Sequence, residues 1–104
     1  MEARRYKLSI LPLFEEDLNE IVDYIALRFE NPIAARALVD DVEKALIERT
    51  YCAESFEPYH SLRERDLPYY RIYVRNYVIF YVVKDDVMEV RRILYSRRDL
   101  KNLI

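Results

Sequence analysis

Six arginines in the last third of the sequence form its strongest candidate site: Arg71, Arg75, Arg91, Arg92, Arg97 and Arg98. Guanidinium groups bind phosphates and carboxylates, and tyrosines interleaved with them suit the recognition of bases or protein surfaces. Arg71, Tyr73 and Arg75 alternate, so they would share one face of a strand. Arg97 and Arg98 follow another strand-like run and could converge with them on one anion-binding surface. Alternatively, the arginines pair with Glu and Asp on the acidic helices, and Arg92 needs a carboxylate if it is buried.

The sequence offers fewer candidate side chains for proton transfer or nucleophilic attack than it does arginines. His60 is the only histidine, and its titration near neutrality suits a general acid or base. However, no serine, cysteine or carboxylate stands at a recognisable spacing from it, and a lone loop histidine is more often solvated. Cys52, the only cysteine, could supply a nucleophilic thiolate, but such a residue more often fills a small apolar space. The phenols of Tyr73 and Tyr95 complete the candidate acids and bases.

Metal and nucleotide-cofactor sites are not expected. The sequence contains no glycine, so it cannot form the glycine-rich loops that cradle phosphates. One cysteine and one histidine cannot assemble a disulfide or a Cys/His zinc site. The carboxylates of Asp40 and Asp41 would diverge on a helix, and those of Asp85 and Asp86 would diverge in a turn. We therefore predict neither a metal nor a cofactor.

Charge is distributed unevenly, although the net charge is only −2. Residues 1–58 hold 13 acidic and 7 basic side chains, whereas residues 59–104 hold 6 acidic and 10 basic ones. This asymmetry indicates either a basic face for an anionic partner or acidic helices packed beside a basic sheet. The longest apolar run, residues 77–83, is far shorter than the roughly 20 residues of a membrane-spanning helix. With no recognisable secretory signal, we expect a cytoplasmic protein without membrane contact.

Hydrophobic periodicity indicates the elements that must position these side chains. Residues 6–10 alternate as in a short strand, and the apolar residues of 14–29 then follow the spacing of one helix face. Asn31 has the character of an N-cap and Pro32 that of a first helical residue, and a second apolar stripe follows to residue 46. The two helices should form an antiparallel hairpin.

Three strands complete the expected fold. Residues 70–75 alternate, residues 77–84 are apolar on both faces, and residues 87–95 are rich in β-branched side chains. The short gaps between these runs force antiparallel hairpins, with residues 77–84 in the centre. We predict one α+β domain over residues 1–104 in the order β-α-α-β-β-β, with the helical hairpin on one face of a small antiparallel sheet and a short C-terminal tail. Five apolar residues should join the helices to the sheet: Leu18, Ile21, Ile25, Leu38 and Leu46.

Four motifs give this sequence a resemblance to a known family. They are the DL..I..YI pattern of the first helix, the AA...V.....A pattern of the second, the strand NYVIFYVV and the ending RILYSRRD. Over nearly the whole chain, the sequence resembles the RelE/ParE superfamily of bacterial type II toxins, which includes the plasmid stabilization proteins. The resemblance implies a small toxin that is neutralised by a tightly bound antitoxin encoded beside it.

Two activities occur in that superfamily. RelE-type toxins cleave mRNA on the ribosome, whereas ParE-type toxins inhibit DNA gyrase. Arg71 and Arg98 match basic positions of the cleaving toxins, but Val78 and Ile104 stand where those toxins carry an arginine and a terminal tyrosine. The acidic net charge also disfavours an RNA-binding toxin. The sequence therefore favours a ParE-like gyrase inhibitor; the alternatives are a RelE-like endoribonuclease and a degenerate toxin that only binds its antitoxin.

These interpretations give the candidate residues different roles. In a nuclease, the catalytic residues would be Arg71, Arg98, Tyr95 and His60. In a gyrase inhibitor, the target or antitoxin would bind a mixed basic, aromatic and apolar set: Arg71, Tyr73, Arg75, Arg97, Arg98, Leu100 and Leu103. The expected partners are a cognate antitoxin and DNA gyrase, or the antitoxin with the ribosome and mRNA. A homo-oligomer and a toxin–antitoxin hetero-oligomer are both compatible with the sequence.

Overall fold

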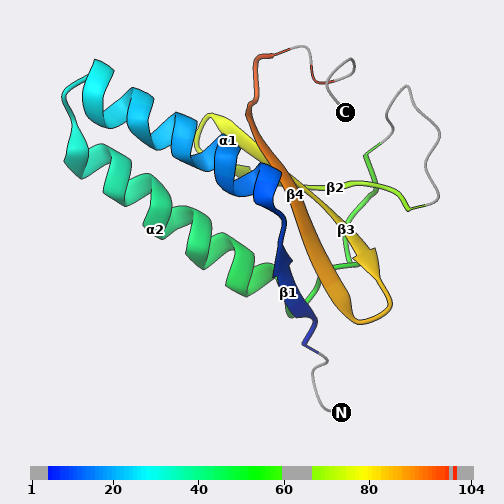
Figure 1. Ribbon diagram of the computed structural model, residues 1–104. Coiled ribbons are helices and arrows are strands. Elements are labelled where there is room, and N and C mark those ends of the chain that lie inside the picture. The colour runs from blue at the N-terminus through cyan, green and yellow to red at the C-terminus, as the bar shows by residue number, and fades with distance from the viewer. Residues whose placement is uncertain (1–4, 60–66, 99, 101–104) are drawn as a thin grey trace.

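The computed structural model describes residues 5–59, 67–98 and 100. Its helices and strands follow in the predicted order β-α-α-β-β-β, and the two helices lie together beside the sheet (Figure 1). A π-helical turn, η1, separates them. The elements are β1 (Lys7–Ile10), α1 (Pro12–Asp23), η1 (Tyr24–Arg28), α2 (Pro32–Arg49), β2 (Tyr70–Val74), β3 (Tyr77–Lys84) and β4 (Val87–Tyr95).

The helices begin where the sequence predicts. Pro12 opens α1 after an extended Leu11, because proline has the φ of a first helical residue and no N–H to leave unpaired. Asn31 caps α2, and its Oδ1 accepts a hydrogen bond of 3.1 Å from the backbone N–H of Ala34. Both the predicted cap and the predicted antiparallel hairpin are confirmed (Figure 1).

The first helix changes its periodicity near its end. After α1 ends at Asp23, the π turn closes its hydrogen bonds one residue later than an α-helix does, so the α-helical spacing of the apolar residues is not kept to its end. Phe29, which the helical spacing places on the buried face, is 63% exposed. Its ring lies edge-on to that of Tyr24, with 5.1 Å between centroids. The predicted buried stripe is thus wrong at Phe29.

The sheet has the strand order β1-β4-β3-β2. β2 and β3, and β3 and β4, pair antiparallel, as the short turns between them predict. β1 departs from the antiparallel prediction because it runs parallel to β4, with Lys7 opposite Val87 and Ile10 opposite Val90. The loop-length argument applies only to strands joined by a short turn, and two helices and two strands separate β1 from β4. The sheet is therefore mixed.

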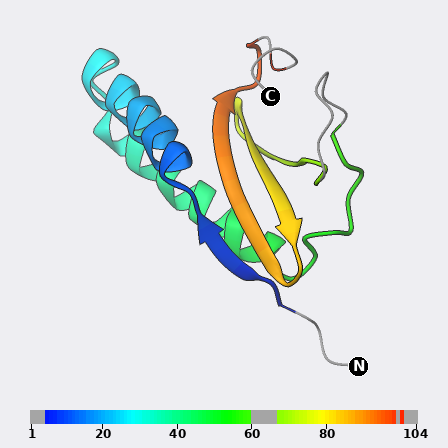
Figure 2. The same ribbon diagram turned by 45° about the vertical axis from the view of Figure 1, so that its right-hand side comes forward.

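The core occupies both faces of the sheet. On the helix side, buried Leu38 and Leu46 and partly buried Leu18, Ile21 and Ile25 pack with the sheet, which confirms the predicted contact set. The opposite face has a smaller cluster, in which Tyr59, Leu67 and Leu100 cover five buried residues: Tyr69, Val78, Phe80, Val82 and Leu94. Figure 2 shows the helices on one side of the strands and the segment after α2 on the other. β3 is thus covered on both faces, as predicted.

A buried carboxylate joins α1 to the C-terminal half of β4. β1 pairs with β4 only as far as Val90, so the later residues of β4 pair with β3 on one side and have no strand on the side of β1. Asp17 supplies the missing acceptor: its Oδ2 accepts a hydrogen bond of 3.2 Å from the backbone N–H of Ile93. Asp17 also binds Arg92 through Nε at 2.7 Å and Nη2 at 3.0 Å. The predicted carboxylate partner of Arg92 is therefore confirmed, and the hydrogen bond to Asp17 raises the pKa of Arg92.

Candidate functional site

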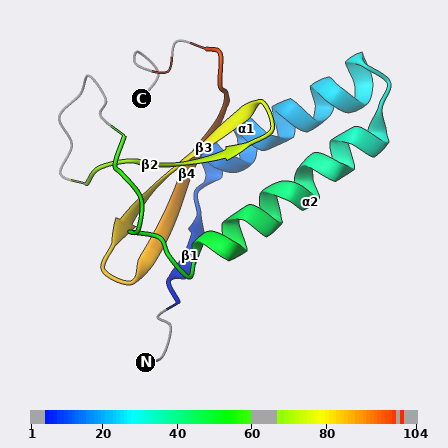
Figure 3. The ribbon, with the colours of Figure 1, turned by 180° about the vertical axis from the view of Figure 1, so that it is seen from behind.

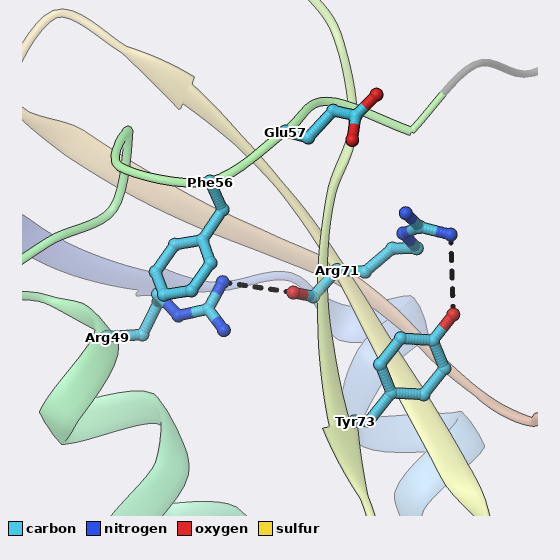
Figure 4. Close-up of a pocket in the computed structure, with 5 residues that line it drawn as sticks. All are labelled: Arg49, Phe56, Glu57, Arg71 and Tyr73. Carbon is cyan, nitrogen blue, oxygen red and sulfur yellow. Dashed lines mark hydrogen bonds between the residues drawn. The ribbon is translucent and has the colours of Figure 1, made fainter.

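A hollow of about 430 Å³ crosses the outer edge of β2 (Figure 4). It is lined by the end of α2, the segment after it and two residues of β2: Arg49, Phe56, Glu57, Arg71 and Tyr73. Figure 3 shows this segment leaving the end of α2 and running past the strands. The sequence pattern identifies Arg71 and Tyr73 but gives no signal for Arg49, Phe56 or Glu57, because their approach depends on the path of an aperiodic segment.

Arg49 is fixed in this hollow by neutral groups. Its Nη1 donates hydrogen bonds of 3.0 Å to the carbonyl oxygen of Arg71 and of 3.0 Å to the hydroxyl of Tyr81. The guanidinium carbon lies 3.6 Å from the ring centroid of Phe56, at the distance of a cation–π contact. The Tyr81 hydroxyl in turn donates to the carbonyl of Ala53 at 2.7 Å, and burial raises the pKa of Tyr81. This network ties the end of α2 to the sheet edge.

Arg71 extends on the other side of the same edge. Its Nη1 donates a hydrogen bond of 3.3 Å to the hydroxyl of Tyr73, and its guanidinium carbon lies 4.9 Å from the ring centroid of Tyr59. Within residues 5–59, 67–98 and 100, neither Arg49 nor Arg71 forms an ion pair with a carboxylate. The hollow therefore presents two guanidinium groups, each beside aromatic rings, to a ligand that carries negative charge.

The other arginines of the sheet are occupied. Arg75 lies in the β2–β3 turn with a φ of 53°, and its Nε binds Asp41 of α2 at 2.8 Å. Arg91 binds Glu89 on its own strand at 2.8 Å. The contacts of Arg75 with Asp41 and of Arg92 with Asp17 confirm the expected pairing with acidic residues of the helices, whereas Arg91 pairs within β4. Arg75 shares the strand end with Arg71 and Tyr73 but points its charge toward α2.

Arg98 lies in a different hollow, of about 770 Å³, where β3 begins and β4 ends. Its neighbours there include four aromatic residues from the helical hairpin and the strands: Tyr24, Phe29, Tyr77 and Tyr95. Burial, followed by the proximity of Tyr95, raises the pKa of Tyr77. The backbone N–H of Arg98 donates to the carbonyl of Tyr95 at 3.1 Å, so the chain turns immediately after β4. Arg97 is exposed beside it.

The structure thus brings some of the predicted site residues together and separates others. Tyr95 and Arg98 share one hollow, and Arg71 and Tyr73 share another, and the two hollows have no lining residue in common. Leu100 packs against the smaller core cluster. Val78, which stands where the cleaving toxins carry an arginine, is fully buried beneath the sheet surface. His60, Leu103 and Ile104 lie outside the described residues.

The described part of the chain contains no group of three or more His, Cys, Asp or Glu side chains that could hold a metal ion. None of its helices is long and apolar enough to cross a bilayer.

Comparison with known proteins identifies the family. A search of curated proteins found no match. Residues 8–100 match a protein-family model described as the ParE toxin of the type II toxin–antitoxin system, parDE. The matched range runs from β1 to Leu100 and includes the described lining residues of both hollows. The chain therefore belongs to the ParE toxin family of type II toxin–antitoxin systems.

Proposed function

We propose that this protein is a cytoplasmic toxin that inhibits DNA gyrase and that a cognate antitoxin holds it inactive. The observation that carries the proposal is the ParE toxin family match over residues 8–100. The separation of Arg71 from Arg98 supports gyrase inhibition over RNA cleavage. Cleavage through a ribose hydroxyl needs a base, a cation and an acid around one phosphate. Here the two arginines that match the cleaving toxins line separate hollows.

The proposed gyrase contact is the end of β4 with the residues that follow it. Arg97 and Arg98 supply exposed positive charge, and the aromatic hollow beside Arg98 supplies apolar surface. Arginine next to aromatic side chains is the composition of strong protein interfaces. Leu100 supports this region through the core, and Leu103 remains a proposed contact outside the described residues.

The antitoxin would bind the toxin through acidic side chains. Arg71 is the proposed anchor because it has no carboxylate partner among the described residues. Arg75 would contribute less to antitoxin binding than its position in the sequence suggests, because its ion pair with Asp41 would first have to break. We expect the complex to be a toxin–antitoxin hetero-oligomer.

A supercoiling assay with purified protein tests the gyrase proposal. We expect inhibition of supercoiling by the wild-type chain and clear weakening in Arg98→Ala. The matched control is Arg36→Ala, which removes an exposed arginine of α2 that forms an ion pair with Asp40 of the same helix. Full supercoiling activity in the presence of wild-type protein would overturn the proposal, as would equal effects of the two substitutions.

A ribosome-dependent endoribonuclease is the second candidate. The observation that favours it is the contact of the Arg71 guanidinium with the Tyr73 hydroxyl, because it places a cation beside a phenol. This candidate predicts cleavage of translated mRNA in a reconstituted system and loss of cleavage in Arg71→Gln and Tyr73→Phe. Intact mRNA would exclude it.

A further inference from the structure

The tip of the helical hairpin, residues 24–33, carries the most exposed apolar side chains of the described residues. Ile33 is 82% exposed, Leu27 is 75% exposed and Phe29 is 63% exposed, and no other large apolar side chain in the described part of the chain reaches these values. They lie where η1 ends and α2 begins, at the point where the hairpin projects past the strands (Figure 1). Exposed apolar side chains gathered in one region are typical of a surface that binds another protein.

Local contacts hold the hairpin tip in one shape. The backbone N–H of Asn31 donates a hydrogen bond of 3.3 Å to the carbonyl of Ile25, across the turn between the helices. Glu30 adopts a φ of 49°, which is uncommon for a residue other than glycine. The rings of Phe29 and Tyr24 pack edge to face. The apolar side chains therefore stand on an ordered turn, and a partner would lose little free energy to ordering it.

Two opposite charges flank Phe29 in the sequence. Arg28 precedes it and Glu30 follows it, and neither forms an ion pair with another described residue. The guanidinium carbon of Arg28 lies 6.0 Å from the ring centroid of Tyr24, so this charge stays beside the aromatic pair. In a two-fold dimer the same patch meets its own copy, and Arg28 of each chain can then face Glu30 of the other. The hairpin tip is thus complementary in charge to itself.

We propose that the hairpin tip binds a second copy of this chain and forms a two-fold homodimer. Leu27, Phe29 and Ile33 of the two copies pack together, and two ion pairs between Arg28 and Glu30 border them. With Tyr24, four large side chains offer roughly 600 Å² of surface per copy, somewhat less than the ≈ 800 Å² per partner of a standard stable interface. We therefore expect a reversible dimer that forms at micromolar concentrations.

A second copy fits this surface better than a strongly charged partner does. An acidic segment would gain Arg28 but meet Glu30, and a basic segment would meet the reverse arrangement. A copy of the chain supplies both signs and an equal apolar centre. Because Tyr24 and Phe29 also line the hollow beside Arg98, the dimer would compete with the proposed gyrase contact for these two rings. Formation of the dimer itself does not depend on the identity of the target.

Sedimentation equilibrium of the purified toxin, at concentrations from about 5 to 200 μM, tests the dimer. We expect the average mass to rise with concentration from that of one chain toward that of two. Ile33→Ser should weaken association at least tenfold, because each dimer loses two buried side chains. The matched control is Ile47→Ser, which removes an isoleucine that is 49% exposed near the other end of α2 and should leave association unchanged. Circular dichroism checks that both variants are folded.

Charge reversal tests the two-fold arrangement. Arg28→Glu and Glu30→Arg each place like charges opposite one another, and each should weaken association about fivefold or more. An equimolar mixture of the two variants restores both contacts between opposite charges and should regain the association. Damage to the fold of either variant would not be repaired by mixing. Lys44→Glu, at an exposed position in the middle of α2, should leave association unchanged.

Four outcomes would overturn the dimer. They are wild-type protein that remains a single chain at about 200 μM, equal weakening by Ile33→Ser and Ile47→Ser, a mixture of the charge variants that associates no better than either alone, and protection of the hairpin tip from hydrogen exchange only when gyrase is added. The last result would assign this surface to gyrase. Failure of the toxin to inhibit supercoiling would overturn the proposed target and leave the dimer unaffected.

Discussion

Replacing Asp17 by alanine should destabilise the fold severely, because one carboxylate satisfies both a strand edge and a buried arginine. The substitution removes the two hydrogen bonds to Arg92 and the one to the Ile93 N–H. The Asp17 and Arg92 side chains are 10% and 23% exposed, so water reaches the arginine only in part. Breaking a buried pair by removing one partner costs about 3 to 5 kcal/mol. The partial exposure of Arg92 places our expectation near the lower end, at about 3 kcal/mol.

Urea unfolding followed by circular dichroism measures this loss, and two further variants divide it. Asp17→Asn keeps an acceptor for Ile93 and should cost about half as much, since a neutral bond is weaker than a charged one. Adding Arg92→Met to Asp17→Ala removes the unpaired guanidinium and should recover about 1 kcal/mol or more. A cost of less than about 1 kcal/mol for Asp17→Ala would refute the reasoning. Additive losses in the double variant would show that the two side chains do not act as a pair.

Three other predictions concern stability. Leu38→Ala should lower the free energy of unfolding by about 2 to 5 kcal/mol, because Leu38 is buried between the helices and the sheet, and a loss below about 1 kcal/mol would contradict that placement. Asn31→Ala should cost about 1 kcal/mol through loss of the α2 cap, whereas Asn31→Asp should retain most of that stability. Raising the pH above 10.0 should destabilise the protein, because the raised pKa of Tyr81 keeps its phenol protonated in the fold while the unfolded chain ionises. Tyr81→Phe should flatten this alkaline slope in pH-dependent unfolding, and an unchanged slope would refute the assignment.

Local signals predicted the elements well. Asn31 and Pro32 act through their own backbone and the next turn, so the start of α2 can be read without tertiary structure. The doubly apolar run of β3 likewise identifies the centre of the sheet. The parallel pairing of β1 and the π turn before Phe29 could not be read in this way. Both depend on how the hairpin packs against the sheet rather than on residues near them in the sequence.

The candidate site was predictable only in part. Period-2 alternation places Arg71 and Tyr73 together, and the structure agrees. The same alternation groups Arg75 with them, but Asp41 on α2 diverts its side chain. Arg49 enters the hollow from a helix end that is 22 residues from Arg71, and no spacing rule connects the two. Contacts between distant elements therefore decide which arginines remain available.

The two ties between α2 and β2 have a consequence for how the toxin would meet its partner. Arg49 holds the carbonyl of Arg71 near one end of β2, and Asp41 holds Arg75 just beyond the other end. The strand edge between them is thus ordered before any partner arrives. Association normally loses free energy to the ordering of loops and side chains at an interface. These two contacts already order the Arg71 carbonyl and the Arg75 side chain, so a partner that contacts this edge would lose little free energy to ordering those groups.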